Sequence, residues 1–102
     1  YLSKETCQLF TTETSKISRR GLGFDKPDAD DPKKGNCAPA APAEVYGHTG
    51  FTGTCAWVDP MNELVYVFLS NRIYPDVTNR KLNQLHIRER IQGAIYDAMK
   101  KK

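Results

Sequence analysis

The sequence predicts an α+β fold in which helices flank an antiparallel sheet of about three strands. Three observations predict it: a segment near the start has a helix cap, two apolar segments flank a five-residue turn, and the last part of the chain has helical periodicity. With 102 residues, the chain has room for one domain with a modest core. So thin a sheet also suggests that the chain is part of something larger.

The first half of the chain is predicted to hold a helix, a strand and a long loop. The helix covers residues 4–11, since the Ser3 hydroxyl can cap a free N–H of its first turn. The strand covers residues 17–24, where apolar residues and glycines alternate. Residues 25–44 are rich in Pro, Asp, Lys, Gly and Ala without periodicity, which predicts a long surface loop.

An antiparallel hairpin is predicted next. Its strands cover residues 53–58 and 64–70 and flank a turn at residues 59–63. Pro60 presets the φ angle of a turn, and Asn62 tolerates unusual dihedrals. The second strand is apolar without alternation, which is typical of a strand covered on both faces. We therefore expect it to be the central strand.

A C-terminal helix is predicted to pack on this sheet. One stripe of its helical wheel is apolar and consists of Ile87, Ile91, Ala94, Ile95 and Ala98. Leu82 and Leu85 lie off the stripe. The helix therefore either begins near Leu85 or bends there.

Charge and hydropathy exclude several partners. The net charge of +3 is matched by the three lysines at positions 100–102, and no stripe of interleaved basic and aromatic residues is present. We therefore expect no nucleic-acid partner. No apolar run is long enough to span a bilayer. The first residues form neither a basic leader nor an apolar signal core, so we expect any targeting segment to lie upstream or to have been removed.

The cysteines and histidines form no recognised metal or redox motif. Cys7, Cys37 and Cys55 are odd in number and lack paired spacing, which favours free thiols, although a disulfide from Cys37 stays open. Together with His48 and His86, two of these cysteines could serve as metal ligands, but the spacing matches no ligand pattern. We expect no metal and no cofactor.

A glycine-rich run at residues 46–54 is the most informative segment. It holds three glycines within seven residues, and a strand tolerates glycines mainly where another backbone or a ligand approaches closely. In its middle, the imidazole of His48, the hydroxyl of Thr49 and the following amides could point into one cleft and recognise an acyl group. The structural alternative is a hydrogen-bonded turn histidine.

The order of motifs along nearly the whole chain carries a family resemblance. The chain resembles the C-terminal part of the serine β-lactamase and penicillin-binding protein superfamily, most closely its esterase and class C β-lactamase-like branch. Some bacterial relatives carry such a domain behind a glycoside hydrolase. The segments that carry the resemblance are residues 2–6, 20–24, 46–54, 57–60 and 67–75 and the final helix with Ile87, Arg88 and Ile91.

The resemblance implies a serine hydrolase that works through an acyl-enzyme, with a small-molecule acyl substrate. The third family signature, Lys-Thr-Gly or His-Thr-Gly, matches His48, Thr49 and Gly50. It implies that the backbone N–H of Phe51 belongs to the oxyanion hole. A histidine at position 48 resembles the esterase-type relatives rather than the common β-lactamase form.

The nucleophile signature of the family is absent from this chain. Neither Ser-x-x-Lys nor Tyr-x-Asn occurs in it. We therefore expect residues 1–102 to be the C-terminal segment of the domain, inactive alone, whose partner is the remainder of the catalytic domain with its serine. The resemblance implies a periplasmic or cell-envelope location. The alternative is a non-catalytic module that binds a glycan or peptidoglycan-like ligand or packs on an enzyme, and the upstream sequence would distinguish the two.

Overall fold

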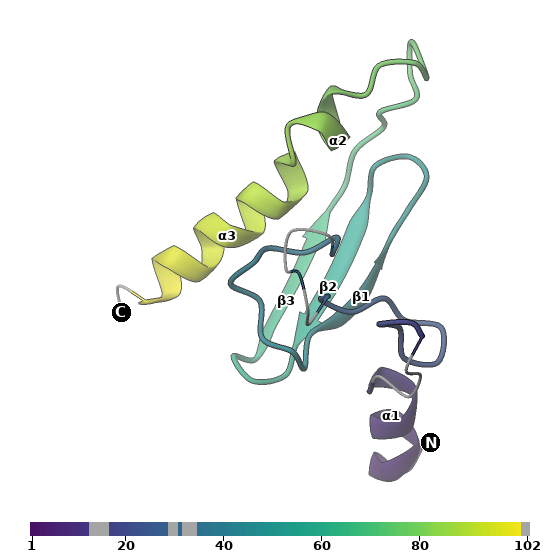
Figure 1. Ribbon diagram of the computed structural model, residues 1–102, viewed down its shortest axis with the longest axis vertical. Coiled ribbons are helices and arrows are strands. Elements are labelled where there is room, and N and C mark those ends of the chain that lie inside the picture. The colour runs from purple at the N-terminus through teal and green to yellow at the C-terminus, as the bar shows by residue number, and fades with distance from the viewer. Residues whose placement is uncertain (13–16, 29–30, 32–34, 101–102) are drawn as a thin grey trace.

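The computed structural model describes residues 1–12, 17–28, 31 and 35–100, and it has the predicted α+β architecture (Figure 1). The sheet has three antiparallel strands in the order β1-β2-β3. α3 runs diagonally beside the sheet, and α1 lies apart from it near the N-terminus. The elements are α1 (Lys4–Thr11), β1 (Tyr46–Thr49), β2 (Cys55–Asp59), β3 (Leu64–Phe68), α2 (Lys81–Gln84) and α3 (Ile87–Lys100).

Helix α1 has the predicted bounds and the predicted cap. The Ser3 hydroxyl accepts a hydrogen bond from the backbone N–H of Thr6 at 3.1 Å, which satisfies a donor of the first turn. No residue of α1 is buried. The end of the helix is tied to the following segment where Lys26 Nζ donates to the carbonyl of Thr11 at 2.7 Å.

The strand predicted over residues 17–24 is wrong, and β1 takes its place in the sheet. Residues 17–24 contain no strand. Gly23 has a φ of 93°, which interrupts an extended backbone. Only the next residue, Asp25, forms a β-bridge, and its partner is Gly47 of β1. The alternation of apolar residues with glycines therefore marked a turn and not a strand.

The hairpin of β2 and β3 is confirmed. Asp59 pairs with Leu64 at the turn, and its carboxylate accepts hydrogen bonds from the N–H groups of Met61 and Asn62 at 2.9 and 3.1 Å. This arrangement is an Asx-type turn. The residue with a left-handed backbone is Glu63, with a φ of 52°, and not Asn62.

The expectation that the second hairpin strand is central is wrong for this chain. β2 is the middle strand, and β3 is an edge. On the face turned away from α3, Val65, Val67 and Leu69 are 65%, 55% and 79% exposed. On the face toward α3, Trp57 and Tyr66 are buried. The apolar run thus reflects one packed face and one face that the described residues leave uncovered.

The chain bends before α3, as the periodicity predicted, but α3 packs through another stripe. His86 has a φ of 50°, and it separates α2 from α3. Within the expected stripe, Ile91 is 39% exposed and Ile95 packs against the core. The buried residues of α3 are instead Arg88, Gln92 and Tyr96.

Hydrogen bonds explain why polar residues of α3 are buried. Tyr96 donates to the buried Asp59 carboxylate at 2.7 Å, and the Gln92 side chain accepts from the N–H of Ala38 at 2.7 Å. A buried polar group that keeps its partner loses little on folding. Burial opposes ionisation of Asp59, but the bonds from Tyr96 and Asn62 outweigh it and hold the pKa below the usual 3.8.

The described residues of 25–44 form no helix or strand, yet they do not form only a surface loop. Asp25, Lys26, Cys37 and Ala38 are buried. The core cluster consists of Cys37, Val45, Cys55, Trp57 and Tyr66. All three cysteines are free, so the disulfide left open for Cys37 is not formed. Residues 29–30 and 32–34 lie outside the described part.

The close packing of β1 on β2 gives a stability prediction. A Cβ at Gly47 would overlap the carbonyl oxygen of Ala56 and lie 2.7 Å from Cε3 of Trp57. We expect Gly47→Ala to lower the free energy of unfolding by about 2 to 3 kcal/mol. Gly93→Ala is the control, since its Cβ would only touch Ala38 at 3.9 Å and a helical alanine gains about 0.5 to 1 kcal/mol. Urea titration measures both, and equal stability of the two variants would contradict the prediction.

Candidate functional site

The four predicted site residues lie where β1 ends and turns into β2. His48 and Thr49 are the last residues of β1, and Gly50 and Phe51 begin the turn. Two backbone bonds close this turn, from Gly50 to the carbonyl of Thr54 at 2.8 Å and from Gly53 to the carbonyl of Gly50 at 3.0 Å. Gly53 has a φ of 94°, a conformation that favours glycine.

The structure does not gather all four residues around one cavity. Side chains alternate along a strand, so His48 and Thr49 point to opposite faces of the sheet. His48 pairs with the exposed Ala56, whereas Thr49 pairs with the buried Cys55. The imidazole therefore lies on the uncovered face, and the Thr49 side chain lies on the face toward α3.

Thr49, Gly50 and Phe51 share a polar pocket of about 370 Å³ with the start of α3. The ionisable side chains that line it are the guanidinium groups of Arg72 and Arg88, the imidazole of His86 and a single carboxylate, that of Glu89. Arg72 lies over the Phe51 ring, with its Cζ atom 4.7 Å from the ring centroid. The pocket can therefore accept an anionic or strongly polar group. Its other lining residues are Gly35, Asn36 and Asn83.

Arg88 is a pocket residue to which the sequence assigned no chemical role. It is only 8% exposed, although arginine is rarely buried without a partner. Its guanidinium donates to Asn83 Oδ1 at 2.9 Å and to the carbonyl of Gly53 at 3.5 Å, and within the described residues its Nε finds no acceptor. Such a buried donor can bind a carbonyl or carboxylate oxygen. No local sequence signal distinguishes it from a surface arginine of the helix.

The backbone N–H of Phe51 is free within the described part of the chain. The amides of Gly50 and Gly53 are used in the turn, but the Phe51 N–H donates to no described residue. The Phe51 ring is 69% exposed, so the turn projects from the surface. A fixed and unpaired N–H at a strand end can stabilise an oxyanion.

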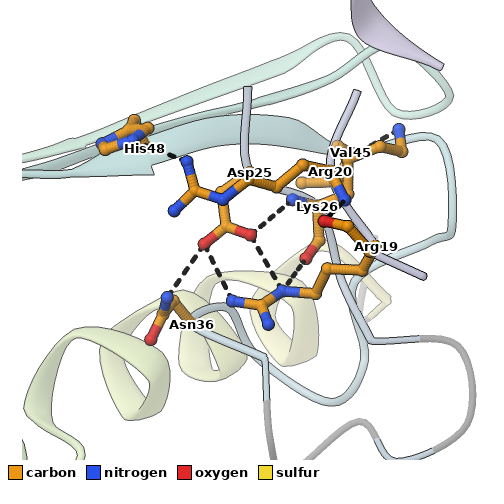
Figure 2. A network of polar contacts seen from close by, with 8 residues as sticks. Arg19, Arg20, Asp25, Lys26, Asn36, Val45 and His48 are labelled. Carbon is orange, nitrogen blue, oxygen red and sulfur yellow. Dashed lines mark hydrogen bonds and ion pairs between the residues drawn. The ribbon is translucent and has the colours of Figure 1, made fainter. Parts of the chain in front are cut away.

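His48 contacts Arg20, a second residue to which the sequence assigned no role (Figure 2). Arg20 Nη1 lies 3.2 Å from His48 Nε2, and His48 Nδ1 lies 2.7 Å from the carbonyl oxygen of Thr49. The two residues are 28 positions apart. Sequence reasoning missed this contact because the segment around Arg20 was expected to be a strand.

A partly buried ion pair anchors the segment that carries Arg20. Arg19 binds the Asp25 carboxylate through Nε and Nη2 at 2.8 and 3.2 Å, and Asn36 donates to the same carboxylate at 2.8 Å. Burial opposes ionisation, but the bonds from Asn36 and Arg19 outweigh it and keep the pKa of Asp25 below 3.8. The backbone of Asp25 also exchanges hydrogen bonds of 2.7 and 3.0 Å with Gly47, which precedes His48.

The other reactive groups of the described chain are not arranged for chemistry. Burial raises the pKa of the Cys37 thiol to about 12 and also raises that of Cys55, so both stay neutral thiols. Across the described ranges, no three His, Cys, Asp or Glu side chains are placed to hold a metal ion. None of the helices in this part is long and apolar enough to cross a membrane.

Comparison with known proteins supports the resemblance. The Beta-lactamase family model matches residues 2–89. The relatives from Escherichia coli O157:H7 and strain K12, each named "Putative D-alanyl-D-alanine carboxypeptidase", are 33% identical over 81 and 79 residues. These matches cover 79% and 78% of this chain but 18% of each relative. No solved structure matches the chain. The chain therefore belongs to the β-lactamase family.

Proposed function

We propose that the chain is the C-terminal segment of a bacterial β-lactamase-related serine hydrolase and supplies the substrate and oxyanion strand. The observation that carries the proposal is the free Phe51 N–H, directly after His48, Thr49 and Gly50 and beside a polar pocket. In acyl transfer, a serine oxygen bonds to the substrate carbonyl carbon while the carbonyl oxygen becomes an oxyanion. The Phe51 N–H would donate to that oxyanion.

The serine would come from the remainder of the catalytic domain, which we propose covers the outer face of the sheet. The outer face is defined here by Ala56, Val65, Val67 and Leu69, and all four are exposed. Exposed apolar patches of this kind mark interaction surfaces. The imidazole of His48 lies on the same face. If the remainder of the catalytic domain covered the outer face, its side chains would reach the end of β1 beside His48.

The names of the relatives support a proposal for the substrate class and the location. Both relatives are named "Putative D-alanyl-D-alanine carboxypeptidase". We propose an ester, amide or β-lactam-like acyl substrate for the whole protein, with the D-alanyl-D-alanine amide as the leading case. The serine hydroxyl proton would pass to a base of the remaining domain, and collapse of the tetrahedral intermediate would break the bond from the carbonyl carbon to the leaving amine or alcohol, which takes up a proton. Water would then hydrolyse the acyl-enzyme to the free acid and the free serine. We propose the cell envelope as the location, with the periplasm as the compartment, because the named reaction acts on a cell-wall peptide.

A fluorophosphonate probe tests whether the segment carries its own nucleophile. The 102 residues contain no Ser-x-x-Lys, so no serine has a lysine at the family spacing to activate it. We expect the chain alone to show no stoichiometric labelling, whereas an authentic serine hydrolase of the family serves as the positive control. Intact-mass spectrometry gives the result. One phosphonate adduct per chain on a serine would contradict the proposed division of the site.

A further inference from the structure

The imidazole of His48 has both ring nitrogens engaged, and the partners specify its tautomer. A guanidinium has only donors, so Nε2 must accept the 3.2 Å hydrogen bond from Arg20. Nδ1 then carries the ring hydrogen and donates it to the carbonyl oxygen of Thr49 at 2.7 Å. In this arrangement the ring is neutral, and the formal positive charge beside the strand end belongs to Arg20.

The guanidinium of Arg20 reaches His48 because its neighbours are fixed in place. The preceding residue, Arg19, is bound to Asp25 through two nitrogens and also donates to the carbonyl of Lys26 at 3.0 Å. Asp25 in turn is bridged to Gly47, the residue before His48. Figure 2 shows the contacts of Asp25 with Arg19 and Asn36 and the contact of Arg20 with His48. These contacts hold Arg20 beside His48 although the two residues are 28 positions apart in the sequence.

We propose that Arg20 is a positioning residue, which fixes the Nδ1–H tautomer of His48 and places a permanent positive charge on the outer side of the substrate strand. An anionic group that approached this side would meet a guanidinium rather than an imidazolium. The meaning of that charge for a substrate rests on the proposed function. The tautomer itself does not, because it follows from the contacts within this chain.

Long-range proton–nitrogen NMR of the 102-residue chain tests the proposal. In the unsubstituted protein we expect His48 to show a protonated Nδ1 and an unprotonated Nε2. Arg20→Met keeps a long side chain but has no donor, so the ratio of the Nδ1–H to the Nε2–H form should fall by about tenfold, as expected for one lost charge-assisted hydrogen bond. Arg20→Lys restores a donor and should restore most of the ratio.

Two controls separate a positioning role from a general disturbance. Arg90→Met removes an exposed arginine that makes no side-chain contact with His48, and it should leave the ratio unchanged. In the two Arg20 variants, His86 should keep its own tautomer ratio in the same spectra. An unsubstituted protein with Nε2 protonated, or an Arg20→Met protein with an unaltered ratio, would overturn the proposal. Neither readout depends on hydrolase activity, so failure here is distinct from failure of the proposed function.

Discussion

Replacement of Phe51 by proline is expected to abolish most of the activity of the proposed serine hydrolase. Proline has no backbone N–H, so it removes the Phe51 donor, which has no acceptor among the described residues. Loss of one oxyanion donor lowers kcat by about 100-fold to 1,000-fold in other acyl-transfer enzymes. We expect a decrease of this size, because the Phe51 N–H would bind the carbonyl oxygen more strongly as its charge develops.

Phe51→Ala is the matched control, because it removes the same ring but keeps the N–H. It also removes the ring beneath Arg72, so a change in KM is expected for both variants. Hydrolysis of a chromogenic ester would give kcat and KM for each. Thermal unfolding would show whether proline disturbs the turn, which loses no native hydrogen bond from residue 51. Equal kcat values for the two variants would exclude Phe51 as an oxyanion donor.

Local signals predicted much of the fold, because they depend on neighbours in the sequence. Ser3 predicted the start of α1, and the turn at residues 59–63 predicted the hairpin. The strand over residues 17–24 is absent because Gly23 has a φ of 93° and the N–H of Leu22 bonds to the carbonyl of Phe10 instead of a neighbouring strand. The predicted apolar stripe of α3 is not its buried face. Gln92 is buried because its side chain accepts a hydrogen bond from Ala38, which is 54 positions away in the sequence.

The candidate site was predicted only as far as its backbone. The motif was expected at the start of a strand, whereas the structure has His48 and Thr49 at the end of β1, a strand that was not predicted. The charged groups around it come from distant segments: Arg20 precedes the motif and Arg88 follows it, and neither lies in a pattern that distinguishes it from a surface arginine. Because no strand was predicted over residues 46–49, the sequence also did not show that His48 and Thr49 point to opposite faces of the sheet.

Among the side chains that hold the Arg20 segment against β1, Asp25 should be the one whose substitution lowers the stability of the protein most. It is 1% exposed, and its carboxylate accepts bonds from Arg19, Asn36 and the N–H of Lys26. In Asp25→Asn, an amide group would face these donors, and the partly buried guanidinium would lose its counter-ion. Because the Arg19 side chain is 30% exposed, water compensates part of the lost attraction. We expect the free energy of unfolding to fall by about 1 to 3 kcal/mol, the cost of leaving buried hydrogen-bond donors without their acceptor. Asp97→Asn, at an exposed position of α3, is the control.

The pH dependence of stability distinguishes this ion pair from simple loss of packing. The folded pKa of Asp25 is lower than its ordinary value of 3.8, so its contribution is complete above pH 3.8 and disappears as the pH falls through the folded pKa. The Asp25→Asn protein lacks this contribution at every pH. The stability difference between the two proteins should therefore be constant above pH 3.8 and should shrink below it. Urea titrations across this range measure the difference. If it stayed constant into acid, the carboxylate charge would not be what holds the Arg20 segment against β1.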